Sequence, residues 1–179
     1  ELSCDERFRE HLVENVLASY RNRNEVRQRL LACRVYVGTV ASFSSKTDLF
    51  KLKRFDVAIV DEATQILEPQ LLWILSAKAP DGKDSVGKFI LIGDHKQLPA
   101  VVLQSKEESE VYDERLRSIG MHNLKDSLFE RLYRFHLSEG DSVVLDMLCR
   151  QGRMHPGVAL FPNQAFYGGR LEAVGLPHQ

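Results

Sequence analysis

Two apolar stretches of this sequence end in acidic side chains, a pattern that can do chemistry on phosphates. Asp61 and Glu62 follow the apolar run 57–60, and Asp94 comes soon after the run 89–92. In open α/β sheets, ligands bind beyond the carboxyl ends of the strands, where these acids are expected to lie. A carboxylate there can hold a hydrated Mg²⁺ ion that also binds substrate phosphates. A second acid beside it can orient or deprotonate the water that attacks phosphorus.

Taken alone, each candidate residue for this chemistry also has a simpler structural explanation, and the same holds for two further polar residues, Gln97 and Arg153. An Asp-Glu pair after an apolar run also fits a turn or a helix cap, Gln97 fits a helix cap, and Arg153 fits a surface ion pair. The occurrence of several such motifs together favours a functional interpretation. Four strings follow one another along the chain: VAIVDEATQ at 57–65, FILIGDHKQLPAVV at 89–102, QGRMHP at 151–156 and FPNQAFY at 161–167.

This set of strings resembles the superfamily 1 helicases of the branch that includes the nonsense-mediated-decay helicase and senataxin. In that family DEAxQ is motif II, GDxxQLxP is motif III and QYRMHP is motif IV. Residues 35–42 look like its motif Ic, so the resemblance covers roughly residues 35–172. It implies a RecA-like P-loop NTPase core, an α/β fold whose mostly parallel sheet carries helices on both faces, here incomplete. The alternation of strand and helix patterns independently favours such a sheet.

The resemblance also implies roles in ATP hydrolysis. Asp61 would bind Mg²⁺, and Glu62 would position the hydrolytic water. Gln97 would sense the γ-phosphate and couple it to the nucleic-acid track, with His95 shaping the loop that holds it. Arg153 would reach the γ-phosphate from a second RecA-like domain. Its planar guanidinium suits phosphate oxygens, and a positioned arginine stabilises charge during phosphoryl transfer.

The implied partners are a single strand of DNA or RNA and the remaining domains of a longer helicase. Thr39 and Ser42 of motif Ic would donate hydroxyl hydrogen bonds to backbone phosphates. The sequence has no Gly-x-x-x-x-Gly-Lys-Ser/Thr loop, whose amides and lysine hold nucleotide phosphates. The motifs that follow motif IV in the family are missing as well. We therefore expect a fragment that does not hydrolyse ATP by itself.

Two functions of different classes stay open at this stage. The first is an enzyme, part of an ATP-dependent helicase or translocase, which the intact acid pair and Gln97 favour. The second is a degenerate helicase-like binding module without ATP turnover, which the missing phosphate loop favours. Gly152 favours the module too, because the family has a tyrosine at this position and the resemblance implies that its ring stacks on adenine.

The elements that must position these residues follow from the apolar periodicity of the chain. We expect a helical segment over 1–34 with Asp5 as its cap, the later part of a first RecA-like domain over 35–150, and the beginning of a second over 151–179. The pattern predicts strands at 34–40, 56–61, 88–92 and 142–145, and helices at 46–53, 68–75 and 123–135.

Composition limits the class of protein. The 179 residues carry 24 Lys and Arg against 25 Asp and Glu, a net charge of −1, so no overall charge points to nucleic acid. One local basic run, 21–34, holds five arginines and one acid, and is interpreted as a solvated helix face or a phosphate-contacting arm. The three cysteines (Cys4, Cys33 and Cys149) lack zinc-site or disulfide spacing and suit the reducing cytoplasm or nucleus. The apolar runs are too short to span a membrane.

Overall fold

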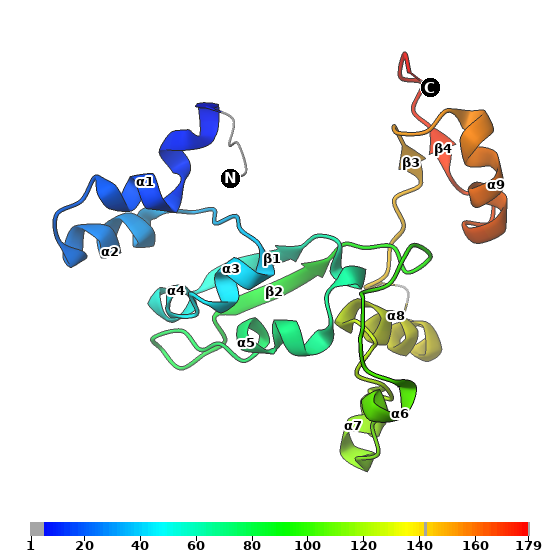
Figure 1. Cartoon of the computed structure of the whole chain (residues 1–179), viewed down its shortest axis with the longest axis horizontal. Coiled ribbons are helices and arrows are strands. Elements are labelled where there is room, and N and C mark those ends of the chain that lie inside the picture. The colour runs from blue at the N-terminus through cyan, green and yellow to red at the C-terminus, as the bar shows by residue number, and fades with distance from the viewer. Residues whose placement is uncertain (1–5, 142, 179) are drawn as a thin grey trace. The chain divides into compact units, whose positions relative to one another are not determined.

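The computed structural model describes residues 6–141 and 143–178. The chain divides into two compact units: unit 1 runs up to Ala58 and includes Leu72–Lys88, and unit 2 comprises Ile59–Leu71 and the chain from Phe89 onward. Strands β1 (Phe55–Val60) and β2 (Val86–Leu91) pair with each other and pass from unit 1 into unit 2 (Figure 1).

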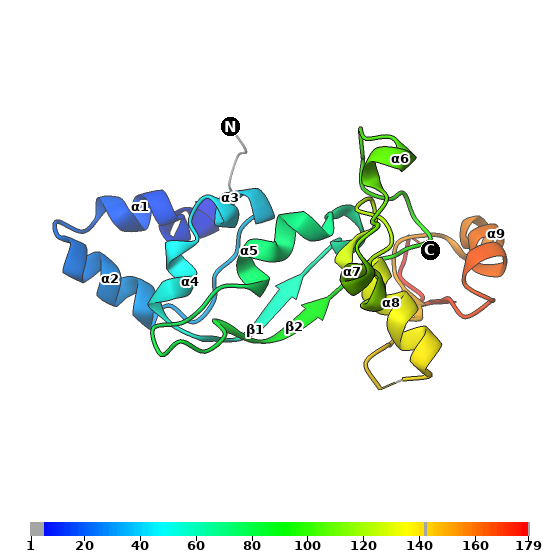
Figure 2. The same ribbon diagram turned by 90° about the horizontal axis from the view of Figure 1, so that it is seen from below.

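β1 and β2 run parallel, as Figure 2 shows. The Phe55 N–H donates to Ser85 O (2.7 Å) near the start of the pair, and the Ile92 N–H donates to Val60 O (2.8 Å) at its end. This register places Ile59 beside Ile90 on one face of the pair. That face is exposed within the described chain, since Ile59 is 65% and Ile90 43% accessible. The predicted parallel α/β arrangement is confirmed, and its helical cover is incomplete on this side.

The predicted continuous helix over the first thirty-odd residues is broken into three pieces. A 3₁₀ turn, η1 (Glu6–His11), precedes the short helix α1 (Val13–Ala18), and α2 (Arg23–Ala32) lies beside α1 (Figure 1). α2 starts afresh because the Asn22 side chain accepts a hydrogen bond from the Glu25 N–H (2.9 Å), which caps the helix. None of the residues in these three pieces is buried. Asp5, the expected cap, lies outside the described residues.

The strand predicted at 34–40 is wrong. The chain is irregular up to Thr39 and then forms the helix α3 (Val40–Ser44). The Tyr36 side chain ties this segment to the end of α2, because its hydroxyl donates to Leu30 O. The Lys53 ammonium, at the end of α4 (Asp48–Leu52), donates to Cys33 O at the C-cap of α2. β-Branched residues favour a strand only where a partner strand is present to pair with.

The core of unit 1 is an aromatic cluster around Phe50 of α4 (Asp48–Leu52). The Phe50 ring lies 5.3 Å from that of Phe55 and 5.1 Å from that of Trp73 in α5 (Leu72–Leu75). Ser85 is fully buried and donates its hydroxyl to Phe50 O (2.6 Å). The helix predicted at 46–53 is confirmed over Asp48–Leu52. This packing fixes where β1 and β2 begin.

Up to residue 141, unit 2 contains short helical turns and one longer helix. The turns are η2 (Ala63–Gln65), η3 (Glu68–Leu71), α6 (Lys106–Ser109) and α7 (Glu114–Ser118), and the helix is α8 (Leu128–Glu139). The helix predicted at 68–75 is confirmed as η3 and α5, and Leu72 within it is 52% exposed. A buried ion pair between Arg131 Nη2 and Glu68 Oε1 (2.6 Å) holds α8 against η3.

α8 starts later than predicted. Ser127 and Glu130 form a reciprocal capping box that sets its first turn. The strand predicted at 142–145 is wrong, because residues 143–145 form no strand; Ser142 lies outside the described residues. The chain continues through β3 (Arg150–Gln151), α9 (Pro156–Phe166) and β4 (Glu172–Ala173), and β3 and β4 pair in parallel.

Candidate functional site

Asp61 lies directly after β1, at the carboxyl end of the strand as predicted. One of its oxygens, Oδ1, accepts a hydrogen bond from the Glu62 N–H (3.0 Å). The side chain is exposed and forms no ion pair with any residue of the described ranges. An exposed carboxylate with an oxygen to spare fits a magnesium ion that takes its other ligands from water and substrate phosphates. Within residues 6–141 and 143–178, no group of three metal-ligating side chains is assembled.

Glu62 adopts a left-handed backbone, with φ 52° and ψ 38°, just before η2. Its exposed carboxylate is 3.5 Å from the side-chain nitrogen of Gln65, the glutamine of the DEATQ string. A non-glycine residue in this conformation is uncommon, and such backbone strain gathers at functional sites. Asp61 and Glu62 therefore present two exposed carboxylates at one strand end, without an ion-pair partner among the described residues.

The loops after β1 and β2 contact each other through Gly93. The Ala63 N–H donates to Ile92 O (2.8 Å), and both Ala63 and Thr64 are buried. A Cβ on Gly93 would lie 3.0 Å from the Thr64 backbone nitrogen, so only glycine fits without a shift. This close approach brings the DEATQ and GDHKQLP segments together.

Asp94 is the hydrogen-bond centre of the second loop. Its Oδ2 accepts from Gln97 Nε2 (2.8 Å) and from the Tyr167 hydroxyl (2.5 Å), and its Oδ1 accepts from the Lys96 N–H (3.0 Å). Partial burial works to raise the pKa of Asp94, but the hydrogen bonds, that of Tyr167 foremost, outweigh it and lower the pKa. The hydrogen bond to Asp94, with some burial, raises the pKa of Tyr167 to about 12.

His95 packs its ring on that of Tyr133 in α8, with the ring centroids 4.3 Å apart. Partial burial, helped by the neighbouring Lys96 charge, lowers the pKa of His95. The neutral ring therefore anchors the start of the loop that carries Gln97 to the longer helix. The loop-shaping role expected for His95 stays a prediction.

Arg153 is exposed in the turn between β3 and α9. Gln151 holds this turn, because its Oε1 accepts from the N–H groups of Arg153 (3.0 Å) and Met154 (2.8 Å). Within the described part of the chain no hydrogen bond or ion pair joins Arg153 to Asp61, Glu62 or Gln97. Gly152 lies close to the C-terminal segment, where an added Cβ would come within 3.0 Å of Leu176 Cδ1.

Thr39 and Ser42, the expected nucleic-acid contacts, lie at the start of α3 in unit 1. The Thr39 hydroxyl caps this helix by accepting a hydrogen bond from the Ser42 N–H (3.1 Å). The expected strand geometry of motif Ic is therefore replaced by a capped helix start. Ser42 remains exposed.

Gly82–Lys88 has the Gly-x-x-x-x-Gly-Lys spacing of a phosphate loop, but Phe89 follows where that loop needs a hydroxyl. Gly87 and Lys88 lie inside β2 instead of at the start of a helix. Their amides therefore do not form the anion-binding helix N-terminus that a phosphate loop provides.

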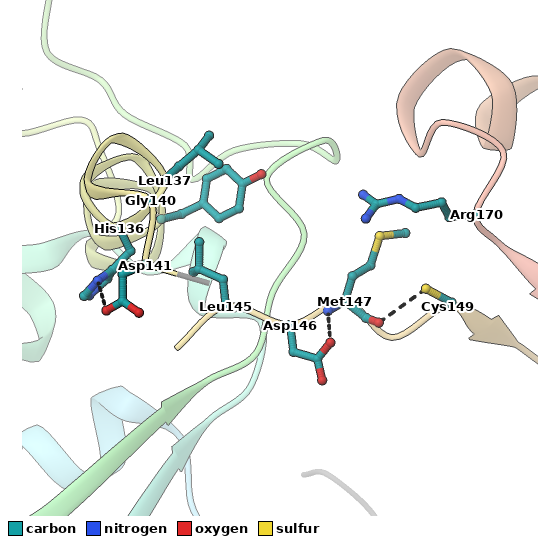
Figure 3. Close-up of a pocket in the computed structure, with 10 residues that line it drawn as sticks. His136, Leu137, Gly140, Asp141, Leu145, Asp146, Met147, Cys149 and Arg170 are labelled. Carbon is teal, nitrogen blue, oxygen red and sulfur yellow. Dashed lines mark hydrogen bonds and ion pairs between the residues drawn. The ribbon is translucent and has the colours of Figure 1, made fainter. Parts of the chain in front are cut away.

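A cavity of about 410 Å³ lies elsewhere in unit 2, between the end of α8 and the segment before β3 (Figure 3). Its lining includes His136, Asp146, Met147 and Arg170, and none of the predicted site residues. Figure 3 shows His136 paired with Asp141, at 3.4 Å between ring nitrogen and carboxylate oxygen. The cavity is therefore separate in its residues from the acids at the strand end.

Two residues of the site were missed by reasoning from the sequence. Tyr167 was visible only as the last residue of the FPNQAFY string, and its partner Asp94 is 73 positions away. Gly93 was visible as the glycine of GDHKQLP, yet its close approach to Thr64 depends on the parallel register of β1 and β2. The periodicity of each strand alone does not reveal it.

Comparison with known proteins agrees with the motifs. Residues 7–105, which are 99 of the 179, match the protein family described as AAA domain. The probable helicase MAGATAMA 3 of Arabidopsis thaliana is 33% identical over 83% of this chain and 15% of its own length. The DNA-binding protein SMUBP-2 of Rattus norvegicus is 36% identical over 75% of the chain and 11% of its own. The ATP-dependent helicase upf1 of Schizosaccharomyces pombe is 34% identical over 66% and 10%.

The chain thus spans no more than 15% of the length of these three relatives. None of the helices in the described ranges is long and apolar enough to cross a membrane. The matched family covers more than half of the chain, and motifs II, III and IV follow in the family order. The chain belongs to the AAA domain family and, within it, to the superfamily 1 helicases of the Upf1 type, with a RecA-like α/β fold.

Proposed function

We propose that this chain is the part of an ATP-dependent helicase or translocase that supplies its metal-binding and water-positioning acids. The observation that carries the proposal is the pair of exposed carboxylates, Asp61 and Glu62, at the carboxyl end of a parallel strand. Neither is neutralised by an ion pair within the described residues. Two adjacent charges that a fold leaves unpaired suit a cation and a phosphate substrate.

In this proposal Asp61 holds Mg²⁺, which when bound would neutralise charge on the phosphates of ATP. Glu62 orients the attacking water and accepts its proton, help that is worth roughly 10²–10⁴ in rate. Gln97 contacts the γ-phosphate, and Arg153, at the beginning of the second RecA-like domain, stabilises the charge that develops there. We place that domain boundary near residue 150.

The proposed track is a single strand of DNA or RNA in the cytoplasm or nucleus, with Thr39 and Ser42 at its phosphates. The DNA-binding name of the SMUBP-2 relative supports a nucleic-acid partner. The chain is proposed to need the other domains of its helicase for ATP turnover, because no phosphate loop is present in its 179 residues.

Replacing Glu62 by Gln in the helicase that contains this chain tests the proposal. The amide keeps the size of the side chain but cannot accept a proton, so we expect nucleic-acid-stimulated ATPase activity to fall by at least about 10²-fold while ATP still binds. Glu139→Gln, a change in an exposed acid at the end of α8, serves as the matched control. Unchanged turnover in the Glu62→Gln enzyme would remove Glu62 from this role.

A degenerate binding module without turnover is the second candidate. It is favoured by Gly152, because a glycine cannot supply the aromatic ring expected to stack on adenine. The reading frame upstream of residue 1 separates the two candidates: a phosphate loop encoded there supports the enzyme, and its absence supports the module.

A further inference from the structure

Tyr167 stands out because it joins two motifs that are far apart in the sequence. It is the C-cap residue of α9, the helix that begins three residues after Arg153. Its hydroxyl lies 2.5 Å from Asp94 Oδ2, and that same oxygen accepts from Gln97 Nε2 at 2.8 Å. Asp94 Oδ2 therefore accepts hydrogen bonds both from Gln97, the residue expected to sense phosphate, and from Tyr167 at the end of α9.

The backbone around Tyr167 holds its ring in place. The Tyr167 N–H donates to Asn163 O (3.1 Å). The Asn163 side chain also bonds both backbone groups of Leu171, donating to its O (2.9 Å) and accepting from its N–H (2.9 Å). The turn after α9 is thus closed on both sides, so the hydroxyl reaches Asp94 from a fixed position and not from a loose loop.

The hydrogen bonds at Asp94 decide how Gln97 is oriented. A glutamine amide has two N–H donors on its nitrogen and an acceptor on its oxygen. Asp94 accepts from this amide nitrogen, and Gln97 also bonds the Tyr167 side chain, so the nitrogen side of the amide is fixed. Hydrogen bonds to a charged group are stronger than neutral ones, so this orientation is well determined.

We propose that Tyr167 is a positioning residue, whose hydroxyl holds Asp94 so that Asp94 orients Gln97 toward the γ-phosphate of a bound nucleoside triphosphate. This rests on the proposed function of the site. The Tyr167 O–H also stabilises the Asp94 carboxylate by donating a hydrogen bond to it. The assignment makes the end of α9 part of the apparatus that responds to nucleotide.

The protonation states favour this arrangement at neutral pH. The pKa of Asp94 is lowered and that of Tyr167 is raised to about 12, so the pair is a neutral hydroxyl donating to a carboxylate. Because the pKa of Tyr167 is higher in the folded than in the unfolded state, its hydrogen bond stabilises the fold at pH values below the ordinary tyrosine pKa of about 10. That contribution is lost as the pH rises from about 10 through the folded-state value of about 12.

Tyr167→Phe in the helicase that contains this chain tests the inference, with Tyr112→Phe as control. Tyr112 is 70% exposed, and its hydroxyl donates to Glu110 (3.3 Å). We expect Tyr167→Phe to lower kcat about tenfold, the size expected for one hydrogen bond to a charged group, with KM for ATP nearly unchanged. In an Asp94→Ala background the same change should have little further effect, because the two act as a unit.

The side-chain amide signals of Gln97, followed by NMR in this chain, provide a second measurement that needs no turnover. Tyr167→Phe should shift them and Tyr112→Phe should not. If the wild-type helicase hydrolyses ATP and Tyr167→Phe is equally active, the inference is overturned and the proposed function stands. The same conclusion follows if Tyr167→Phe lowers kcat by the same factor in the Asp94→Ala background as in the wild type. If the wild type shows no turnover, the proposed function fails, and unmoved Gln97 signals in Tyr167→Phe would overturn the inference separately.

Discussion

Glu62 is held in a backbone conformation that its own Cβ disfavours. It is the only non-glycine residue with positive φ in the part of the chain that the structure describes. A left-handed residue with a side chain costs roughly 1–2 kcal/mol. The buried contacts of Ala63 and Thr64 keep the turn closed, so the strain falls on the residue that carries the acid.

Glu62→Gly should therefore stabilise the fold while removing the acid. Glycine adopts positive φ without the Cβ clash but loses more entropy on folding, so we expect a net gain of up to about 1 kcal/mol in the free energy of unfolding. Urea denaturation measures this gain, with Glu62→Ala as control. The alanine variant keeps a Cβ and should gain nothing, and a glycine variant less stable than the alanine one would contradict the strain argument.

At the residue scale, local pattern predicted part of the site and no more. Asp61 lies at a strand end because the apolar run before it is short and ends in a turn, which the sequence displays. The left-handed φ of Glu62 and the bond from Tyr167 to Asp94 were not predictable in this way. Both depend on contacts between segments that are distant in the chain. The roles of Asp61, Glu62, Gln97, Arg153, Thr39 and Ser42 stay predictions.

At the scale of elements, the wrong helix and strand predictions fall on segments that are exposed or have no neighbouring strand in the described structure. The apolar stripe of residues 8–20 predicts one helix, but Phe8 is 57% and Leu12 40% exposed, so no packing holds the helix together. The β-branched segment 34–40 likewise has no strand beside it among residues 6–141 and 143–178. β1, β2 and α8, which do pack against other elements, were predicted correctly apart from their ends.

Reversing charges on α2, which carries part of the basic run 21–34, can test whether that run contacts phosphates. Arg23 and Arg27 lie one turn apart, are exposed and form no ion pair with described residues. If they contact phosphates, Arg23→Glu with Arg27→Glu should weaken binding of a labelled single-stranded oligonucleotide. The slope of log affinity against log salt should then fall by roughly 0.7 for each lost contact.

Fluorescence anisotropy at several salt concentrations gives that slope. Lys83→Glu with Lys106→Glu makes the same charge change at two exposed positions elsewhere. Equal slopes for the two double variants would mean that α2 has only a solvated face.

At the scale of the whole molecule, the sequence predicted the class of fold but not its extent. Alternating strand and helix patterns led to a parallel α/β core, and the family match agrees. Two of the four predicted strands are wrong, since residues 34–40 and 143–145 form none, and β3 and β4 were not predicted. A strand needs a neighbouring strand to pair with, and the pattern alone does not reveal that neighbour. The domain boundaries expected near residues 34 and 150 stay predictions.

The open face of β1 and β2 should make the separate chain self-associate. Four aliphatic side chains there are at least 40% exposed: Val57, Ile59, Ile90 and Ile92. Apolar patches of this kind drive association in water. Ile59→Lys should shift the chain toward the monomer in sedimentation velocity, whereas Ile119→Lys, at a 48% exposed position beyond α7, should not. Equal sedimentation of both variants would rule out this face as the cause.

The close contact between Thr64 and Gly93 limits the substitutions that position 93 can accept. Any side chain at position 93 would collide with the Thr64 backbone, at 3.0 Å from the new Cβ. Trimming Thr64 to a smaller residue does not remove that obstacle, since the obstructing atom belongs to the main chain. Any other residue at position 93 therefore requires the Thr64 backbone to move by a few tenths of an ångström, so the geometry of each loop depends on that of the other.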